Sequence, residues 1–204
     1  MPSVFGWAWL ALFMAITVVR KLHERRSGRR STLSGNAPLE SVLMVAWGMA
    51  AGIVPLVFLF TDWLAFADIT LPAFAGVVGV VLFVVAIWLL DRSHRDLGAG
   101  WAPQVEPGTG GALVTDGVFG CVRHPMYSAH VVWGIAQALL LPNLLAGPLA
   151  LVLMIPLLAL RIPREERALT DEFGDAYRSY MERTPRLVPR LGALRSTLPP
   201  AERR

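Results

Sequence analysis

The sequence has little charge, one cysteine and one lysine. Charged residues make up 17% of its 204 residues against 54% hydrophobic ones, and the mean hydropathy is +0.51. This balance excludes an ordinary soluble domain and predicts an integral membrane protein. Cys121 alone cannot form a disulfide within the chain. The net charge of +4 comes almost wholly from arginines in loops and in the tail, which argues against a nucleic-acid partner and for contact with anionic membrane lipids.

Three uncharged runs in the N-terminal half predict membrane-spanning helices. They are Val4–Val19, Ser41–Thr61 and Ile69–Leu90. The second and third have about 20 residues each, enough to cross a bilayer, and the first reaches roughly 25 Å, just short of the hydrocarbon core. We interpret the first run as an uncleaved span and not a signal peptide, because its basic residues follow the apolar run. Gly52 and Pro55 predict a kink in the second span.

A longer uncharged segment, Pro125–Leu160, contains no Asp, Glu, Lys or Arg, and Pro, Asn and Gly gather at 142–148 in its middle. This pattern predicts a hairpin of two apolar helices. The predicted fold class is therefore all-α, a polytopic membrane protein with about five spans. We expect a single membrane domain over 1–204, with three N-terminal spans (1–91), a core that carries the hairpin and a C-terminal helix (92–190), and a tail (191–204).

Charge asymmetry predicts the orientation in the membrane. The connection Arg20–Leu39 is rich in arginine, whereas the connection between the second and third runs carries Asp62 and Asp68 but no Lys or Arg. Since short basic loops stay in the cytoplasm, we expect the N-terminus outside, and the arginine-rich segments with the C-terminus inside.

Asp91–Phe119 reads as a polar, glycine-rich connection. Its glycines permit close backbone approach to a ligand, and a loop without a binding role is an equal alternative. His94 and Asp96 lack partners at metal-ligand spacing, so we predict no metal site.

An amphipathic helix is predicted from Arg161 to about Met181, after the hairpin. Apolar residues recur along it at helical spacing, and the spacing of four places Arg161 and Glu165 on its inward face. Pro163 predicts a kink where this helix follows the hairpin. The residues from Arg183 to Arg204 read as an irregular basic tail.

Two polar clusters flank the hairpin, one ending in Arg123, His124 and Tyr127, the other holding Arg161 and the Glu165-Glu166 pair. A hairpin between them predicts that they meet at one end of the bundle. Taken alone, His124 fits a helix cap before Pro125, and Arg161 fits a membrane-interface anchor. Beside the other cluster, a ligand-binding role for His124 is favoured. We expect Glu166 to be a solvated residue in the first turn of its helix, where negative charge suits the helix dipole.

The strings LVTDGVFGCVRHPMY and EERALTDEFGDAYRSYMERTPRLVP, separated by the hairpin, resemble the isoprenylcysteine carboxyl methyltransferases and the related phospholipid methyltransferases. These are integral membrane enzymes that use S-adenosylmethionine. The resemblance covers roughly Gln104 to Pro189, and the first three spans match only as generic membrane helices. The chain departs from the family where Phe119 stands in place of a frequent Tyr, where Gly111 replaces a residue with a polar side chain, and where Ala129 replaces a glycine.

The resemblance implies the site residues. S-adenosylmethionine would be held by Gln104, Gly111, Ala112, Leu113, Val114, Phe119, His124, Pro125, Met126, Tyr127 and Glu165. Arg161, one helical turn before Glu165, would contact the methyl acceptor, and these two residues with His124 are the candidate catalytic residues.

Elementary chemistry agrees with the resemblance. Glu165 can pair with the ammonium of the donor, and Tyr127 and Phe119 offer flat faces to its adenine or sulfonium. A carboxylate acceptor is already ionised near neutral pH and needs no general base, and Arg161 would attract it. We therefore expect carboxyl O-methylation of a lipophilic acceptor of the isoprenylcysteine type, with the site on the cytoplasmic side.

Two alternatives remain at this stage. One is an N-methyltransferase for a phospholipid or another lipid amine. The other is a non-enzymatic membrane transport or assembly protein, which is disfavoured because charged residues avoid the centres of the predicted spans. The oligomeric state is not indicated.

Overall fold

The described part of the chain is mainly helical. The structure, a computed structural model, describes residues 3–27, 38–98 and 112–190. Its elements are α1 (Val4–Ser27), α2 (Pro38–Gly48), the π-helical turn η1 (Met49–Ile53), α3 (Val54–Phe60), the 3₁₀ turn η2 (Ala65–Ala67), α4 (Ala73–Leu97), α5 (Val118–Cys121), α6 (Pro125–Leu140), α7 (Leu149–Phe173) and α8 (Asp175–Arg183). These residues contain no strand, only an isolated bridge between Asp68 and Asn143. The predicted all-α class is confirmed, and the predicted tail 191–204 lies outside the described residues.

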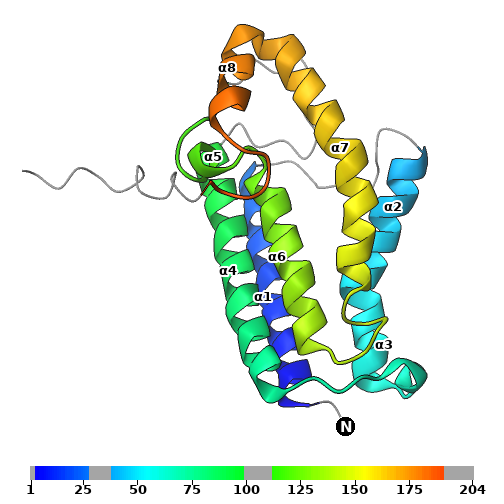
Figure 1. The fold of residues 1–204 in the computed structure, drawn as a ribbon. Coiled ribbons are helices and arrows are strands. Elements are labelled where there is room, and N and C mark those ends of the chain that lie inside the picture. Colours follow the sequence, from blue (N-terminus) through cyan, green and yellow to red (C-terminus); the bar gives the residue numbers. More distant parts are fainter. Residues whose placement is uncertain (1–2, 28–37, 99–111, 191–204) are drawn as a thin grey trace, which may run out of the picture.

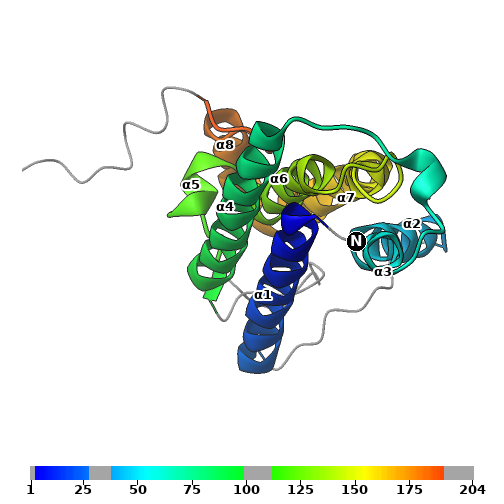
Figure 2. The same ribbon diagram turned by 90° about the horizontal axis from the view of Figure 1, so that it is seen from below.

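The helices form two groups that α6 joins. In Figures 1 and 2, α1, α4 and α6 stand together, while α2 and α3 stand beside α7. The buried side chains of Trp9, Phe83, Trp133 and Leu140 belong to the core of this bundle. A Cβ added at Gly79 of α4 would lie 2.8 Å from Leu140 Cγ, so a residue without a side chain lets α4 approach α6 closely. Small residues serve this purpose at helix contacts in membranes, where close packing replaces the hydrophobic effect as the driving force.

Among the described residues, three helices are long and apolar enough to cross a membrane, namely Val4–Arg25, Pro38–Phe60 and Ala73–Leu97. They correspond to the three runs predicted in the N-terminal half. The N-terminal end of α1 lies at the opposite end of the bundle from α5 and α8 (Figure 1). Which end faces the cytoplasm stays a prediction.

The second span is interrupted by η1, where the sequence predicts a kink. Pro55 has no N–H and its ring excludes the normal helical partner four residues back. A π-helical turn meets this constraint, because Val54 N–H donates to the Met49 carbonyl, five residues back. Gly52 in the same turn faces α1, and a Cβ there would lie 3.1 Å from Phe13 Cζ.

The third span extends further than predicted. α4 begins after Pro72 and continues to Leu97, so Asp91–Leu97 is helical and the prediction of a connection beginning at Asp91 is wrong. Ion pairs spaced by four residues explain the polar extension: Arg92 lies 3.0 Å from Asp96 and Arg95 lies 2.9 Å from Asp91. Such pairs stabilise a helix face exposed to water.

The predicted hairpin is present as α6, the turn 141–148 and α7. The buried Asn143 side chain fastens the turn, because its amide donates to the Leu64 carbonyl at 2.7 Å and to Asp68 Oδ1 at 2.8 Å. Its carbonyl oxygen accepts from the backbone N–H groups of Leu145 and Ala146, both at 3.0 Å. The return of the chain at this turn brings the C-terminal half of α7 back to the beginning of α6. That both hairpin helices cross the membrane, which would give five spans, stays a prediction.

The helix after the hairpin differs from the prediction at both ends. α7 is continuous through Pro163, so the hairpin and the segment from Arg161 share one helix of 25 residues. The predicted continuation to Met181 is wrong, because α7 ends at Phe173 and Gly174 has a φ of +55°. Only glycine adopts this conformation without strain, so the chain changes direction there and begins α8.

The segment after α8 is irregular, as predicted, but it packs against the beginning of α6. The Arg123 N–H donates to the Pro185 carbonyl at 2.8 Å, and the His124 N–H donates to the Arg186 carbonyl at 3.0 Å. The Ser128 hydroxyl donates to the Leu187 carbonyl at 2.7 Å. This docked segment, residues 184–190, therefore fixes the backbone that carries His124.

Candidate functional site

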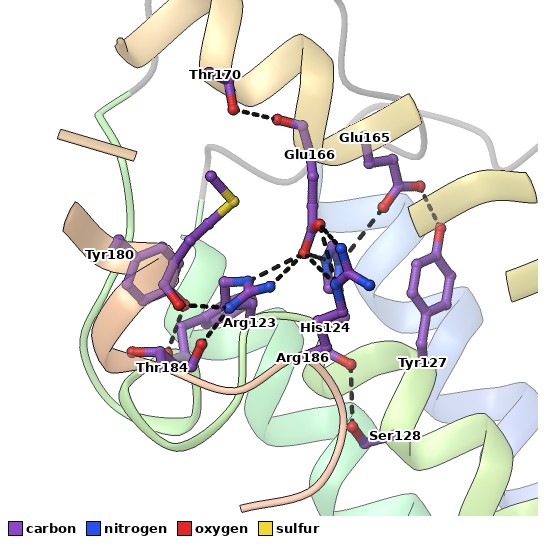
Figure 3. Close-up of polar contacts among 12 residues, drawn as sticks. Arg123, His124, Tyr127, Ser128, Glu165, Glu166, Thr170, Tyr180, Thr184 and Arg186 are labelled. Carbon is purple, nitrogen blue, oxygen red and sulfur yellow. Dashed lines mark hydrogen bonds and ion pairs between the residues drawn. The ribbon is translucent and has the colours of Figure 1, made fainter. Parts of the chain in front are cut away.

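His124 stands at the beginning of α6 with its side chain turned toward α7. It occupies the N-cap position before Pro125, yet its imidazole makes no capping hydrogen bond. The ring is buried instead between the two glutamates of α7, with Nε2 3.3 Å from Glu166 Oε1 and Nδ1 3.7 Å from Glu165 Oε2 (Figure 3). The capping explanation for this side chain is therefore wrong.

Glu166 is the most heavily paired carboxylate of the site. Arg123 donates to it from Nε at 3.1 Å and from Nη2 at 2.7 Å, and Arg186 donates from Nη2 at 2.7 Å. Burial raises the pKa of this carboxyl, but the hydrogen bonds from His124, Arg186 and Arg123 outweigh burial and lower the pKa of Glu166 to about 2. The same contact raises the pKa of Arg186.

The prediction that Glu166 is a solvated first-turn residue is wrong for two reasons. Its side chain is only 7% exposed, and α7 begins at Leu149, so Glu166 lies well inside the helix. Its partners come from the two residues just before α6, Arg123 and His124, and from the docked segment 184–190. Glu166 thus holds three parts of the chain together, and its oxygens are occupied by protein donors.

Arg123 also connects the residues around Glu166 to α8. Its Nη1 donates to the Met181 carbonyl at 2.9 Å and also to the Thr184 carbonyl. The buried Tyr180 hydroxyl donates to the Phe119 carbonyl at 2.6 Å, which joins α8 to α5. Arg123 and Tyr180 therefore keep the two short helices against the beginning of α6, and Figure 3 shows the contacts of Arg123.

Glu165 faces a different group of residues and is less buried. The Tyr127 hydroxyl of α6 donates to Glu165 Oε1, and Arg161 Nε lies 3.5 Å from the same oxygen. The carboxylate is 21% exposed, and its two ionic contacts, to Arg161 and His124, are longer than a charge-assisted hydrogen bond. Of the two glutamates, Glu165 is the one with capacity for a further donor.

Arg161 lies between α7 and α2 and is only 12% exposed, which rules out a simple interface anchor. Its Nε is 3.5 Å from Glu40 Oε1, its Nη1 is 3.0 Å from Met44 Sδ, and its guanidinium carbon is 6.0 Å from the centre of the Tyr127 ring. The sequence indicates no role for Glu40, which appears there as a single acid at the start of a span.

The remaining predicted cofactor residues divide into two sets. Ala112, Leu113 and Val114 lie in the non-helical segment before α5, with Ala112 exposed and the other two half-buried. Phe119 is half-buried in α5, Pro125 is buried at the start of α6, and Met126 packs against the core. The other set, Gln104 and Gly111, lies outside the described residues.

The geometry therefore brings four of the predicted residues, His124, Tyr127, Arg161 and Glu165, to one end of the bundle.

Residues 77–171, which run from α4 through most of α7, match the model of the isoprenylcysteine carboxyl methyltransferase (ICMT) family. The chain is therefore similar to this family over slightly less than half of its length. The matched range begins within the third span, earlier than the resemblance in the sequence indicates, and it ends before α8.

Several curated proteins are similar to parts of the chain. A protein-S-isoprenylcysteine O-methyltransferase of Schizosaccharomyces pombe is 35% identical over 77 residues, which are 38% of this chain and 33% of that protein. Form B of Arabidopsis thaliana is 38% identical over 77 residues, 38% of this chain and 39% of the relative. Form A of the same plant is 26% identical over 163 residues, 76% of this chain and 80% of the relative. The first two matches thus span only 33% and 39% of the relatives' own length.

A solved structure has the same fold. The eukaryotic intramembrane Ras methyltransferase ICMT superimposes with a TM-score of 0.53 at 21% identity, over 89% of this chain and 62% of that chain. Since this match extends well beyond residues 77–171, the N-terminal helices also belong to the ICMT fold.

Proposed function

We propose that this protein transfers the methyl group of S-adenosylmethionine to the carboxylate of a lipophilic acceptor of the isoprenylcysteine type. The observation that carries the proposal is the pair formed by His124 on α6 and Glu165 on α7. A carboxylate oxygen accepts hydrogen bonds only, so the contact of His124 Nε2 with Glu166 requires the proton on Nε2. Its Nδ1 lies 3.7 Å from Glu165 Oε2, so the ring and this carboxylate flank the same position.

The Glu165 carboxylate favours a cationic ligand at this position. The ammonium of S-adenosylmethionine has three N–H donors and can pair with Glu165. The Tyr127 hydroxyl orients the carboxylate from the other side. Phe119 and the backbone of Ala112–Val114 would hold further parts of the donor, together with Gln104 and Gly111. When bound, the donor supplies a methyl carbon activated by its sulfonium.

Arg161 would hold the acceptor. A guanidinium binds a carboxylate through two parallel hydrogen bonds and repels an ammonium, which supports a carboxyl acceptor over a lipid amine. The acceptor carboxylate is ionised near neutral pH, so the residues of the site need only align it with the methyl carbon and exclude water. The names of the relatives describe O-methylation of S-isoprenylcysteine, which agrees with this assignment.

The membrane helices support a lipophilic acceptor. Arg161 and Tyr127 adjoin an apolar cluster that contains Met154, Leu157 and Leu158 of α7. We propose that the acceptor enters from the bilayer and the donor from the cytoplasm, where the positive-inside rule puts the arginine-rich end.

The test uses the full chain purified in detergent micelles with lipid. It is incubated with methyl-labelled S-adenosylmethionine and an N-acetylated S-farnesylcysteine, and the matched control is the carboxamide of the same compound. We expect label only with the free carboxylate, and we expect alkali to release it, because a methyl ester is hydrolysed and a methylamine is not. Alkali-stable label on an added lipid amine would favour the N-methyltransferase alternative. Absence of both labelling and donor binding would contradict an enzymatic function.

A further inference from the structure

We propose that Glu40 is a positioning residue that keeps the Arg161 guanidinium away from Glu165, so that Glu165 is available to the methyl donor. This inference deepens the proposed function and rests on it. Glu40 lies in α2, outside the matched family range of residues 77–171.

Arg161 lies at equal distances from two glutamates, Glu40 and Glu165. Arg161 Nε lies 3.5 Å from Glu40 Oε1 and 3.5 Å from Glu165 Oε1. Charge-assisted hydrogen bonds between a guanidinium and a carboxylate are normally about 2.7–2.9 Å long. Arg161 is therefore shared between two carboxylates, one on each helix, and is not closed onto either.

The second observation is that Glu40 is held independently of Arg161. Its other oxygen, Oε2, accepts from Arg164 Nη1 at 2.5 Å, and its side chain is only 5% exposed. It also lies in the first turn of α2, where the helix dipole stabilises a negative charge. Glu40 is thus a fixed anion on one side of the guanidinium.

The two observations together give Glu40 a function in donor binding. Without its charge, Arg161 has Glu165 as its neighbour at i+4 on the same helix, and the pair would close. The closed pair would occupy the oxygen that Tyr127 orients, and the donor's ammonium would compete with a buried arginine for it. Glu40 prevents this by attracting Arg161 from the other side.

The Nη1 edge of Arg161 shows where the acceptor would bind. Nη1 contacts the thioether sulfur of Met44, which is a weak acceptor. An acceptor carboxylate would replace that sulfur without displacing either glutamate. Arg161 would then bind the acceptor through Nη1, while its Nε stays between Glu40 and Glu165.

The test measures donor affinity by titration calorimetry with S-adenosylmethionine and the full chain in detergent. We expect Glu40→Gln to raise the Kd about 10-fold or more, and Arg161→Gln to bind the donor at least as tightly as the parent. The decisive variant is the double substitution Glu40→Gln with Arg161→Gln. Because no guanidinium is left to close onto Glu165, we expect its Kd to return to within about 3-fold of the parent value.

A purely structural role for Glu40 predicts a different pattern. If Glu40 only fastens α2 to α7, the double variant would bind the donor as weakly as Glu40→Gln or more weakly, and Arg164→Gln would weaken binding to the same extent. Either result would overturn the proposal, and so would an unchanged Kd for Glu40→Gln. If Glu40→Gln does not fold, the double variant is compared with Arg161→Gln instead: equal donor Kd values support the proposal, and weaker binding by the double variant overturns it. Failure of both Glu40 variants to fold assigns Glu40 to stability alone. If the parent protein does not bind the donor, the proposed function itself is wrong. If the parent protein binds the donor and methylates the acceptor, a negative result concerns the role of Glu40 alone.

Discussion

The Tyr127 hydroxyl of α6 donates a hydrogen bond to Glu165 of α7, which links two residues 38 positions apart in the sequence. The intervening chain is the hairpin, which is uncharged up to Leu160, and its two helices pack on each other. The length of these helices and the turn fastened by Asn143 therefore set the register of the site. A change of register at that turn would separate Tyr127 from Glu165.

Removal of the Tyr127 hydroxyl tests its part in donor binding. A hydrogen bond to a charged group contributes about 1.5–3 kcal/mol, which corresponds to roughly 10-fold or more in affinity. We expect Tyr127→Phe to remain folded, because its ring packs beside the apolar cluster of α7, and to raise the donor Kd about 10-fold. Titration calorimetry measures the Kd, and an unchanged value would show that this hydroxyl does not orient Glu165.

Arg123 is expected to matter for stability. Its side chain is 7% exposed and pairs with Glu166, which is equally buried. Loss of one member of such a pair leaves a buried charge uncompensated, at a cost of about 3–5 kcal/mol. We predict that Arg123→Met unfolds at a much lower temperature than the parent in the same detergent.

The matched control for Arg123 is Arg178→Met in α8. Arg178 pairs with Asp175, but its side chain is 63% exposed, and exposed pairs contribute about 0–1 kcal/mol. Its unfolding temperature should stay close to that of the parent. Equal losses in the two variants would mean that the buried pair has no special role.

The low pKa of Glu166 predicts a dependence of stability on pH. Its carboxyl has an ordinary pKa of 4.5 and a pKa of about 2 in the folded protein, so folding favours the ionised form. The resulting stability is fully present above about pH 4.5 and is lost as the pH falls toward 2.

Thermal unfolding between pH 6 and pH 2.5 measures this effect. Glu166→Gln should be less stable than the parent at pH 6, because Arg123 loses its counter-charge. Its unfolding temperature should also fall less steeply between pH 4.5 and pH 2.5 than that of the parent. Parallel curves for the two proteins would assign the acid sensitivity to other groups.

The meeting of His124 with Glu165 could be predicted from the sequence because it depends on a coarse feature, an uncharged hairpin between two polar clusters. The spans Val4–Arg25, Pro38–Phe60 and Ala73–Leu97 follow in the same way from hydrophobic length. Neither prediction requires knowledge of individual side-chain contacts.

The role of Glu166 could not be predicted, because it depends on contacts between distant segments. Arg123 lies 43 positions before it and Arg186 lies 20 positions after it. Local pattern favoured a solvated residue, and tertiary contacts overrode that preference. The same holds for Glu40, which is 124 positions from its partner Arg164.

The end of α7 was mispredicted for a local reason. The apolar spacing of Leu169, Phe173 and Tyr177 continues past Gly174, and hydrophobic periodicity alone therefore predicts one helix. The positive φ of Gly174 ends it, and Tyr177 then becomes buried on α8 instead. Burial raises the pKa of Tyr177 to about 12.

The central claim is that the site at the meeting of α6 and α7 binds S-adenosylmethionine through Glu165. Its most direct test is the donor Kd of Glu165→Gln, measured by titration calorimetry beside Glu182→Gln, a change of the same chemistry at an exposed residue of α8. We predict that Glu165→Gln stays folded and raises the Kd about 10-fold or more, while Glu182→Gln stays within about 2-fold of the parent. A folded Glu165→Gln variant that binds the donor as tightly as the parent would contradict the account.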